Sequence, residues 1–304
     1  MFEGVNAVLT TPFARDGSID ESSLRSKIRW LIEQGIAGSD GVLVPCGSTG
    51  ECHVLSLDEM KTVASITVEE ADGKATVVVG SNRTSTAEAI ELAHHAEKIG
   101  AQGLMNLAPF YWKPEPEAIY NHFRSLNDAT AIPILVYNNM YVNQVDIDLP
   151  LLTRICELDH IAAVKECTPS FEKLEQVVRL LGDKVEVING RGELNEPYGY
   201  LMGTRGYVSI IANYAPKLTV ELHRLGLAGQ YREFFEMKSR TAMPMLDYIG
   251  KLPPSHEAIV IKKIEEMLGI IKSAAVRAPY VALSDAVCAD IKALLEKTGQ
   301  GSVA

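Results

Sequence analysis

The fold is decided by residues 132–137 (IPILVY), the segment 149–158 that follows them, and residues 161–165 (IAAVK). Two short apolar runs flank a longer segment whose apolar residues recur with helical spacing, which predicts a strand, a helix and a second strand. Both runs are apolar on both faces, as in parallel strands that helices cover on each side. From Tyr137 to Lys165 the chain advances 28 residues, close to the roughly 31 per unit of a (β/α)8 barrel of about 250 residues.

The same alternation runs from the N-terminus to about residue 228. Each of eight short apolar runs precedes one longer amphipathic stretch, which fits a (β/α)8 (TIM) barrel better than an open doubly wound sheet. The predicted strands are 5–10, 41–45, 75–79, 103–107, 132–137, 161–165, 185–188 and 206–210, and the predicted helices are 21–34, 57–70, 85–99, 116–127, 149–158, 171–181, 194–202 and 216–227.

The remaining segment has helical patterns without strand-like runs. Amphipathic stretches cover 231–246, 256–268 and 284–295. The sequence therefore predicts two parts, a barrel over 1–228 and a C-terminal helical region over 229–304 that packs on it.

Composition narrows the class of protein. A chain of 304 residues can bury a large core, and a net charge of −10 without basic patches argues against nucleic-acid or anionic-membrane partners. No basic leader and no run of eighteen apolar residues is found, so we expect a cytoplasmic enzyme. The five cysteines form no C-x-x-C pair and the histidines have no metal-ligand spacing, so we expect reduced thiols and no metal site.

Polar residues follow four of the predicted strands. In barrels of this type the reacting groups lie at the carboxyl ends of the strands. Strand one ends in TTPF (10–13), strand two in GSTGE (47–51), strand five in YNN (137–139) and strand six in KE (165–166). We therefore expect all four groups on one rim.

Lys165 closes its apolar strand as a lone amine. Burial disfavours the ammonium form and lowers the pKa of a lysine, so such an amine can act as a neutral nucleophile and form a Schiff base with a carbonyl substrate. On its own, the strand also fits a lysine whose ammonium reaches water past the apolar layer. The polar groups on the same rim favour the reactive lysine.

Tyr137, Ser48 and Thr49 are the expected partners of Lys165. Tyr137 ends the neighbouring strand, so a phenol and an amine can meet over the barrel axis, with Thr49 as a relay for the phenol proton. The turn at Ser48 and Thr49 gathers hydroxyl and backbone N–H groups, which suits a small carboxylate or a developing oxyanion. The turn also fits a plain capped loop, and Tyr137 also fits packing at a strand end.

Five motifs together carry a resemblance. TTPF (10–13), GSTGE (47–51), PFYWKP (109–114), YNN (137–139) and VKE (164–166), in this order and spacing, resemble the dihydrodipicolinate synthase and N-acetylneuraminate lyase family through nearly the whole barrel. The resemblance implies a (β/α)8 barrel with a C-terminal helical region, usually a homotetramer. It also implies a lysine Schiff base with pyruvate or another 2-oxo acid, and no metal or organic cofactor.

The resemblance also implies roles for individual residues. Lys165 is the amine, Tyr137 the acid/base with Thr49, and Tyr111 reaches a neighbouring subunit's site as part of a proton relay. The substrate-binding residues are predicted to be Ser48, Thr49, Gly50, Gly190, Arg191, Glu193 and Val208.

Two loops depart from the family pattern. The synthases carry an arginine five residues after the strand-five tyrosine, where this chain has Val142, so a bidentate grip on a second carboxylate is missing. After strand seven, where sialic-acid lyases place acidic groups for sugar hydroxyls, the chain reads NGRGE (189–193) and only Glu193 matches. Arg191 either meets a second anionic group of the substrate or is a structural arginine. The loop 137–145 is also similar to that of the branch that deaminates a hydroxyproline-derived imino acid.

The functional prediction is a class I lyase acting on a 2-oxo acid by aldol cleavage, dehydration or deamination through a lysine Schiff base. One alternative is 4-hydroxy-tetrahydrodipicolinate (dihydrodipicolinate) synthase activity, which condenses pyruvate with an aldehyde. The other is a non-catalytic relative that binds without reacting. The retained Lys165, Tyr137 and Thr49 favour the enzymes.

Overall fold

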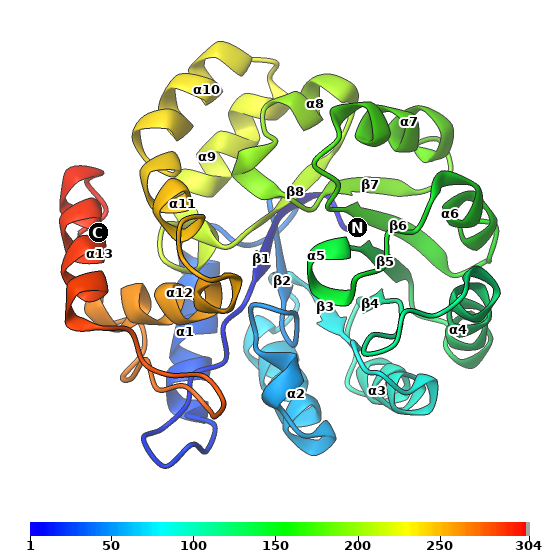
Figure 1. Cartoon of the computed structure of the whole chain (residues 1–304), viewed down its shortest axis with the longest axis horizontal. Coiled ribbons are helices and arrows are strands. Elements are labelled where there is room, and N and C mark those ends of the chain that lie inside the picture. Colours follow the sequence, from blue (N-terminus) through cyan, green and yellow to red (C-terminus); the bar gives the residue numbers. More distant parts are fainter. Residues whose placement is uncertain (302–304) are drawn as a thin grey trace.

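The computed structural model describes residues 1–301 and contains a closed barrel of eight parallel strands in sequence order. Figure 1 shows the strands at the centre and the helices around them. The predicted (β/α)8 architecture is therefore confirmed. The strands are β1 (Gly4–Val8), β2 (Gly41–Val44), β3 (Thr76–Gly80), β4 (Gly103–Leu107), β5 (Ile134–Asn138), β6 (Ile161–Glu166), β7 (Glu186–Asn189) and β8 (Gly206–Ser209).

The strands form because their residues are apolar on both faces and are buried on both. One face packs on the outer helices and the other fills the barrel interior. The outer helices are α1 (Glu21–Glu33), α2 (Leu57–Ala71), α3 (Thr86–Lys98), α4 (Pro116–Ala129), α6 (Leu149–Ile155), α7 (Phe171–Leu181), α8 (Tyr198–Met202) and α9 (Pro216–Leu227), and short 3₁₀ turns lie at η1 (Cys52–Val54), η2 (Gly192–Leu194) and η3 (Ile211–Asn213).

Two predicted helices are each divided in two, for the same physical reason. The segment 194–202 becomes η2 and then α8, and the two are separated at Pro197. The segment 231–246 divides into α10 (Tyr231–Arg240) and α11 (Met243–Ile249), with Pro244 in the first turn of α11. Proline lacks the N–H that a helix interior requires and is tolerated in the first turn, so each new helix starts at its proline.

A short helix, α5 (Met140–Asn143), was not predicted. It follows β5 directly and lies inside the ring of outer helices in Figure 1. A four-residue helix is too short to show a hydrophobic period, so the sequence pattern carried no signal for it.

The C-terminal helices pack on the barrel through an apolar cluster and a group of buried ion pairs. Besides α10 and α11 they are η4 (Pro254–His256), α12 (Glu257–Met267) and α13 (Asp285–Lys297). The apolar side chains of α11, α12 and α13 form one cluster with Ile211 and Tyr214, which follow β8, whereas Phe234 of α10 packs in the main cluster of the barrel. The division of the chain into a barrel over 1–228 and a helical region over 229–304 stays a prediction. The last three residues of the predicted helical region, 302–304, lie outside the described residues.

We call the buried ion pairs of α12 the ionic junction. Lys262 Nζ lies 2.7 Å from Glu51 Oε1 in the turn after β2. Lys27 of α1 pairs with Glu265, and Thr10 donates to the other Glu265 oxygen at 2.6 Å. The junction therefore ties α12 to the loops that leave β1 and β2, on the rim where the functional residues were expected. Among the described helices, none is long and apolar enough to span a membrane.

Candidate active site

Lys165 lies near the end of β6 with 4% of its surface exposed. Its Nζ lies 3.8 Å from the centroid of the Tyr137 ring and 3.9 Å from Met105 Sδ. Within residues 1–301, no carboxylate lies at ion-pair distance from this amine. Burial lowers the pKa of Lys165, and the charges of Cys167 and Glu257 raise it in part. These surroundings favour the neutral, nucleophilic amine.

The strand register explains why the amine and the phenol meet. Tyr137 of β5 is paired with Lys165 of β6, so the two side chains leave adjacent strands at the same level. The Lys165 amine lies over the face of the Tyr137 ring. Asn139 donates to the Tyr137 hydroxyl at 2.8 Å. Burial raises the pKa of Tyr137 above its ordinary value, and the side chains of Ser48 and Asn139 lower it in part.

Gly190 gives Lys165 and Cys167 the room they occupy. A Cβ atom at Gly190 would lie 2.2 Å from Cys167 Sγ and 3.0 Å from Lys165 Cγ. The contact with the sulfur atom is far too short for packed atoms, and the contact with the lysine carbon is tighter than ordinary packing. The thiol is not activated, because burial raises the pKa of Cys167 to about 12. Cys167 therefore shapes the site, and we assign it no nucleophilic role.

The Gly-Ser-Thr-Gly turn faces Lys165 from the opposite side of the barrel, after β2. Thr11 donates to the Gly50 carbonyl at 2.8 Å, and a Cβ at Gly50 would lie 2.9 Å from the Leu9 carbonyl oxygen, so a side chain has no space there. Thr49 is buried and Ser48 is partly exposed. The Ser48 hydroxyl lowers the pKa of Tyr137, and Thr49, the predicted relay partner of the phenol, makes its hydrogen bond elsewhere.

Thr49 instead contacts a residue that sequence reasoning missed. Its hydroxyl donates to Glu257 Oε1 at 3.3 Å, across a separation of 208 residues. Glu257 is the first residue of α12. Burial raises its pKa, while the hydrogen bond from Thr49 and the charge of Lys165 lower it. A possible signal was an acidic residue on the face of the segment 256–268 that also carries Ile261 and Glu265, at intervals of four.

Arg191 lies on the other flank of Lys165, after β7. Its guanidinium is 5.4 Å from the centroid of the Tyr141 ring, and its charge lowers the pKa of Cys167. Its Nε is buried and has no hydrogen-bond partner among residues 1–301. Val142, which stands at the family's arginine position, is 45% exposed on α5. The rim therefore has an apolar residue at position 142 on α5 and a cation, Arg191, in the loop after β7.

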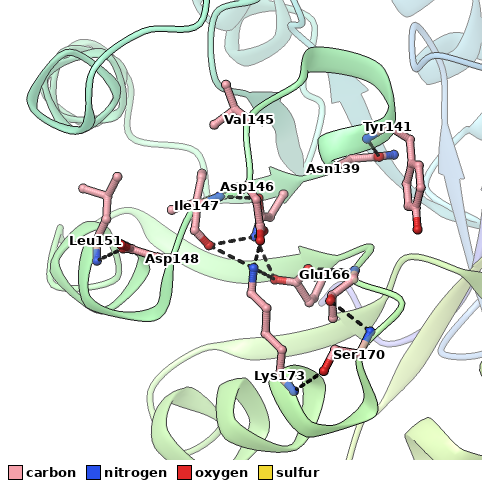
Figure 2. Close-up of polar contacts among 12 residues, drawn as sticks. Asn139, Tyr141, Val145, Asp146, Ile147, Asp148, Leu151, Glu166, Ser170 and Lys173 are labelled. Carbon is pink, nitrogen blue, oxygen red and sulfur yellow. Dashed lines mark hydrogen bonds and ion pairs between the residues drawn. The ribbon is translucent and has the colours of Figure 1, made fainter.

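The loop that carries Tyr141 and Val142 is held at both ends (Figure 2). Asn139 accepts from Tyr141 N at 2.9 Å. Lys173 of α7 pairs with Asp146 and donates to the Ile147 carbonyl at 3.1 Å. These bonds fix the segment from β5 to α6, so α5 stays at the mouth of the barrel.

Glu193 and Val208 face inward. Ser209 donates to Glu193 at 2.5 Å, and burial raises the pKa of Glu193 to about 7. Val208 is buried in the apolar cluster of the barrel interior together with Met105 and Tyr137. Of the two, Val208 lies among the residues around Lys165, whereas Glu193 is bound to Ser209 at the end of β8.

Tyr111 stands apart from the site in the single chain. It is 86% exposed, has a φ of 94°, and packs edge-on against Trp112 at 5.7 Å between centroids. A positive φ is unusual for an aromatic residue and marks local backbone strain. Residues 1–301 bring no group of metal-ligating side chains together, and their five cysteines are free thiols.

Comparisons with known proteins agree with this architecture. A sequence profile of the dihydrodipicolinate synthetase family matches residues 1–298. The chain is 38% identical over 262 residues to the 4-hydroxy-tetrahydrodipicolinate synthase of Bradyrhizobium diazoefficiens, covering 86% of this chain and 82% of that one. It is 33% identical to the synthase of Pelobacter propionicus, covering 98% and 99%.

Among solved structures, the crystal structure of dihydrodipicolinate synthase from Aquifex aeolicus superposes with a TM-score of 0.92 at 27% identity, covering 99% of both chains. The sequence profile and the curated relatives each cover most of the chain. The resemblance noted in the five rim motifs is therefore confirmed, and this protein belongs to the dihydrodipicolinate synthetase family.

Proposed function

We propose that this protein is a cofactor-independent lyase that condenses pyruvate with an aldehyde through a Schiff base on Lys165, as a 4-hydroxy-tetrahydrodipicolinate synthase. The observation that carries the proposal is the Lys165 amine, buried against the Tyr137 ring and Met105 without an ion-pair partner in residues 1–301. A buried amine without a counter-ion is poised to be neutral, which is the form that attacks a carbonyl carbon.

The reaction then follows from the positions of the neighbours. Lys165 attacks the keto carbon of pyruvate, while the turn containing Ser48, Thr49 and Gly50 holds the carboxylate through hydroxyl and backbone N–H groups. The resulting iminium draws electrons from the adjacent methyl carbon, so that carbon loses a proton and becomes a nucleophilic enamine. The enamine adds to the aldehyde, and Tyr137 moves protons with the help of Ser48.

Arg191 supports the synthase reaction despite the valine at position 142. Its guanidinium lies beside Tyr141 at the mouth, and its Nε has no hydrogen-bond partner in the described part of the chain. A guanidinium with free donors suits a carboxylate. We assign it to the carboxylate of the aldehyde substrate. Val142 favours a second candidate, cleavage, dehydration or deamination of a 2-oxo acid that has no second carboxylate.

The remaining predicted residues receive supporting roles. Gly190 and Val208 shape the space around Lys165, and Glu193 holds the β7 loop through Ser209. Tyr111, which is exposed in the single chain, extends to the site of a neighbouring copy in a homotetramer. The homotetramer and the cytoplasmic location remain predictions.

A substrate panel tests the proposal. Pyruvate is offered with aspartate semialdehyde, and 2-keto-3-deoxy sugar acids, N-acetylneuraminate and the hydroxyproline-derived imino acid are tested for turnover alone. We expect the highest kcat/KM with pyruvate and aspartate semialdehyde. Faster turnover of any other member would overturn the synthase assignment in favour of the second candidate.

Arg191→Ala tests the second binding site. The KM for aspartate semialdehyde should rise about tenfold or more, because a hydrogen bond to a charged group contributes about 1.5–3 kcal/mol. Imine formation with pyruvate alone should not change. Arg232→Ala is the matched control, because Arg232 is an exposed arginine of α10 whose ion pair, with Glu236, stays within that helix. An unchanged KM for the aldehyde would contradict the role of Arg191.

A further inference from the structure

Glu257 is the charged residue of α12 that has no ion pair within residues 1–301. Lys262 pairs with Glu51 and Glu265 with Lys27 in the ionic junction, and Lys263 pairs with Glu266 on the surface. An unpaired carboxylate in a desolvated place is unfavourable, so its presence calls for a cation or a proton.

The position of Glu257 relates it to the reaction. Its carboxylate accepts from the Thr49 hydroxyl at 3.3 Å, and that hydroxyl belongs to the turn assigned to the substrate carboxylate. Little more than one helical turn after Glu257, Lys262 donates to Glu51, the residue that follows Gly50, so the ionic junction fixes α12 against the same turn. Lys165 of β6 and Glu257 influence each other's pKa, as do Glu257 and Tyr137 of β5. Glu257 therefore lies beside the turn after β2, on the side of the barrel opposite β6.

Imine formation requires a proton at this place. A neutral amine and a keto group give a neutral carbinolamine. Its hydroxyl must take a proton before the C–O bond breaks, water leaves, and the nitrogen lone pair forms the C=N bond of a cationic iminium. If a carboxyl group supplies that proton, its O–H bond breaks and the products are water, an iminium and a carboxylate. The positive charge of the iminium and the negative charge of the carboxylate then balance each other.

We propose that Glu257 is a further catalytic residue, delivered by the C-terminal helices: its carboxyl group protonates the leaving hydroxyl of the carbinolamine and then remains as the counter-ion of the Lys165 iminium. The proposal rests on the Schiff-base chemistry proposed above. Burial supports it in two ways. It raises the pKa of the Glu257 carboxyl, which favours the protonated form, and it raises the pKa of Tyr137, which makes the phenol a reluctant acid.

Borohydride trapping with pyruvate measures this step. The trapping rate is recorded at a borohydride concentration above which it no longer rises, so that imine formation limits it, and the adduct on Lys165 is identified by peptide mass. Glu257→Gln keeps the acceptor for Thr49 and removes the proton. We expect trapping to slow about a hundredfold, within the range of general acid catalysis. Glu296→Gln, an exposed carboxylate of α13, is the matched control and should trap at the wild-type rate.

Glu257→Ala provides a readout that a structural role would not give. Added formate should restore trapping in proportion to its protonated form, because a small acid can occupy the vacated space. Either variant alone decides the question if the other fails to fold. Wild-type rates in Glu257→Gln, or slow trapping in Glu257→Ala without a response to formate, would overturn the proposal. Absence of any adduct in the wild-type protein would instead overturn the Schiff-base chemistry itself.

Discussion

The ionic junction and the pocket around Lys165 both bury lysines, and they differ in one respect. Lys27 and Lys262 of the junction are fully buried, and each lies against a carboxylate, Glu265 and Glu51 respectively. Lys165 is almost as buried, yet its neighbours are an aromatic ring and a thioether. Burial lowers the pKa of all three. In the junction a contacting carboxylate opposes that effect, whereas the Lys165 amine touches no carboxylate in residues 1–301, so a contacting counter-ion distinguishes the structural lysines from the reactive one.

The two regions should also respond differently, in free energy of unfolding, when a buried lysine is replaced. A buried ion pair is strongly unfavourable when one partner is removed, so the junction should be sensitive to single substitutions. The pocket holds an amine whose ammonium form is disfavoured in the folded state, so replacing it should not weaken the fold. The predictions below separate these two kinds of buried lysine.

The largest effect is expected at Lys165. Lys165→Ala should abolish turnover, because the nucleophile is lost, while the thermal unfolding midpoint stays at or above that of the wild-type protein. Turnover of pyruvate with the aldehyde and a thermal unfolding curve measure both quantities. Full activity in this variant would show that another group performs the chemistry.

The next effect concerns the junction. Lys27→Met should reduce the free energy of unfolding by about 3–5 kcal/mol, because it leaves Glu265 buried without compensation. Urea unfolding measures the loss. The double substitution Lys27→Met with Glu265→Gln should recover a large part of it, since no uncompensated charge remains. A loss below 1 kcal/mol in the single variant would remove the contrast between the two regions.

Tyr137→Phe should slow turnover by about a hundredfold, as loss of a general acid/base does. The Lys165 amine and the ring face remain in place, so borohydride trapping with pyruvate should still yield an adduct. Steady-state kinetics and trapping together measure the two results. Loss of trapping along with turnover would mean that the phenol is required for the amine to react at all.

The smallest effect is a pH dependence of stability. The pKa of Lys165 in the folded state lies below its ordinary value of 10.5. Between the two values the unfolded chain binds more protons at this residue than the folded one, so stability rises with pH there. Lys165→Met should therefore be more stable than wild type at pH 7, and the difference should shrink as the pH rises toward 10.5. Urea unfolding at several pH values measures it, and a constant difference would contradict it.

Periodicity was sufficient to predict the barrel, because each strand is apolar on both faces and each helix is amphipathic. The predicted strand 103–107 has the bounds of β4, Gly103–Leu107. Two predicted helices are divided at Pro197 and Pro244, where a local rule about proline would have corrected them, and α6 ends at Ile155, three residues before its predicted end. The four-residue α5 has no period to detect.

The site was predictable where strand ends define it, and less so where distant segments meet. Lys165 and Tyr137 end neighbouring strands, and the sequence placed them together correctly. Glu257 meets Thr49 across 208 residues, a contact that leaves no local pattern. Whether Ser48 or Thr49 turns toward Tyr137 depends on side-chain direction within the turn, which residue type alone does not determine.

One measurement tests the reactive role of the unpaired lysine most directly. The wild-type protein is incubated with pyruvate and borohydride, digested, and its peptides are analysed by mass spectrometry. We predict a single reduced pyruvate adduct on Lys165, and none on Lys27 or Lys262, whose ammonium groups are held by Glu265 and Glu51. No adduct, or an adduct on another lysine in place of Lys165, would contradict it.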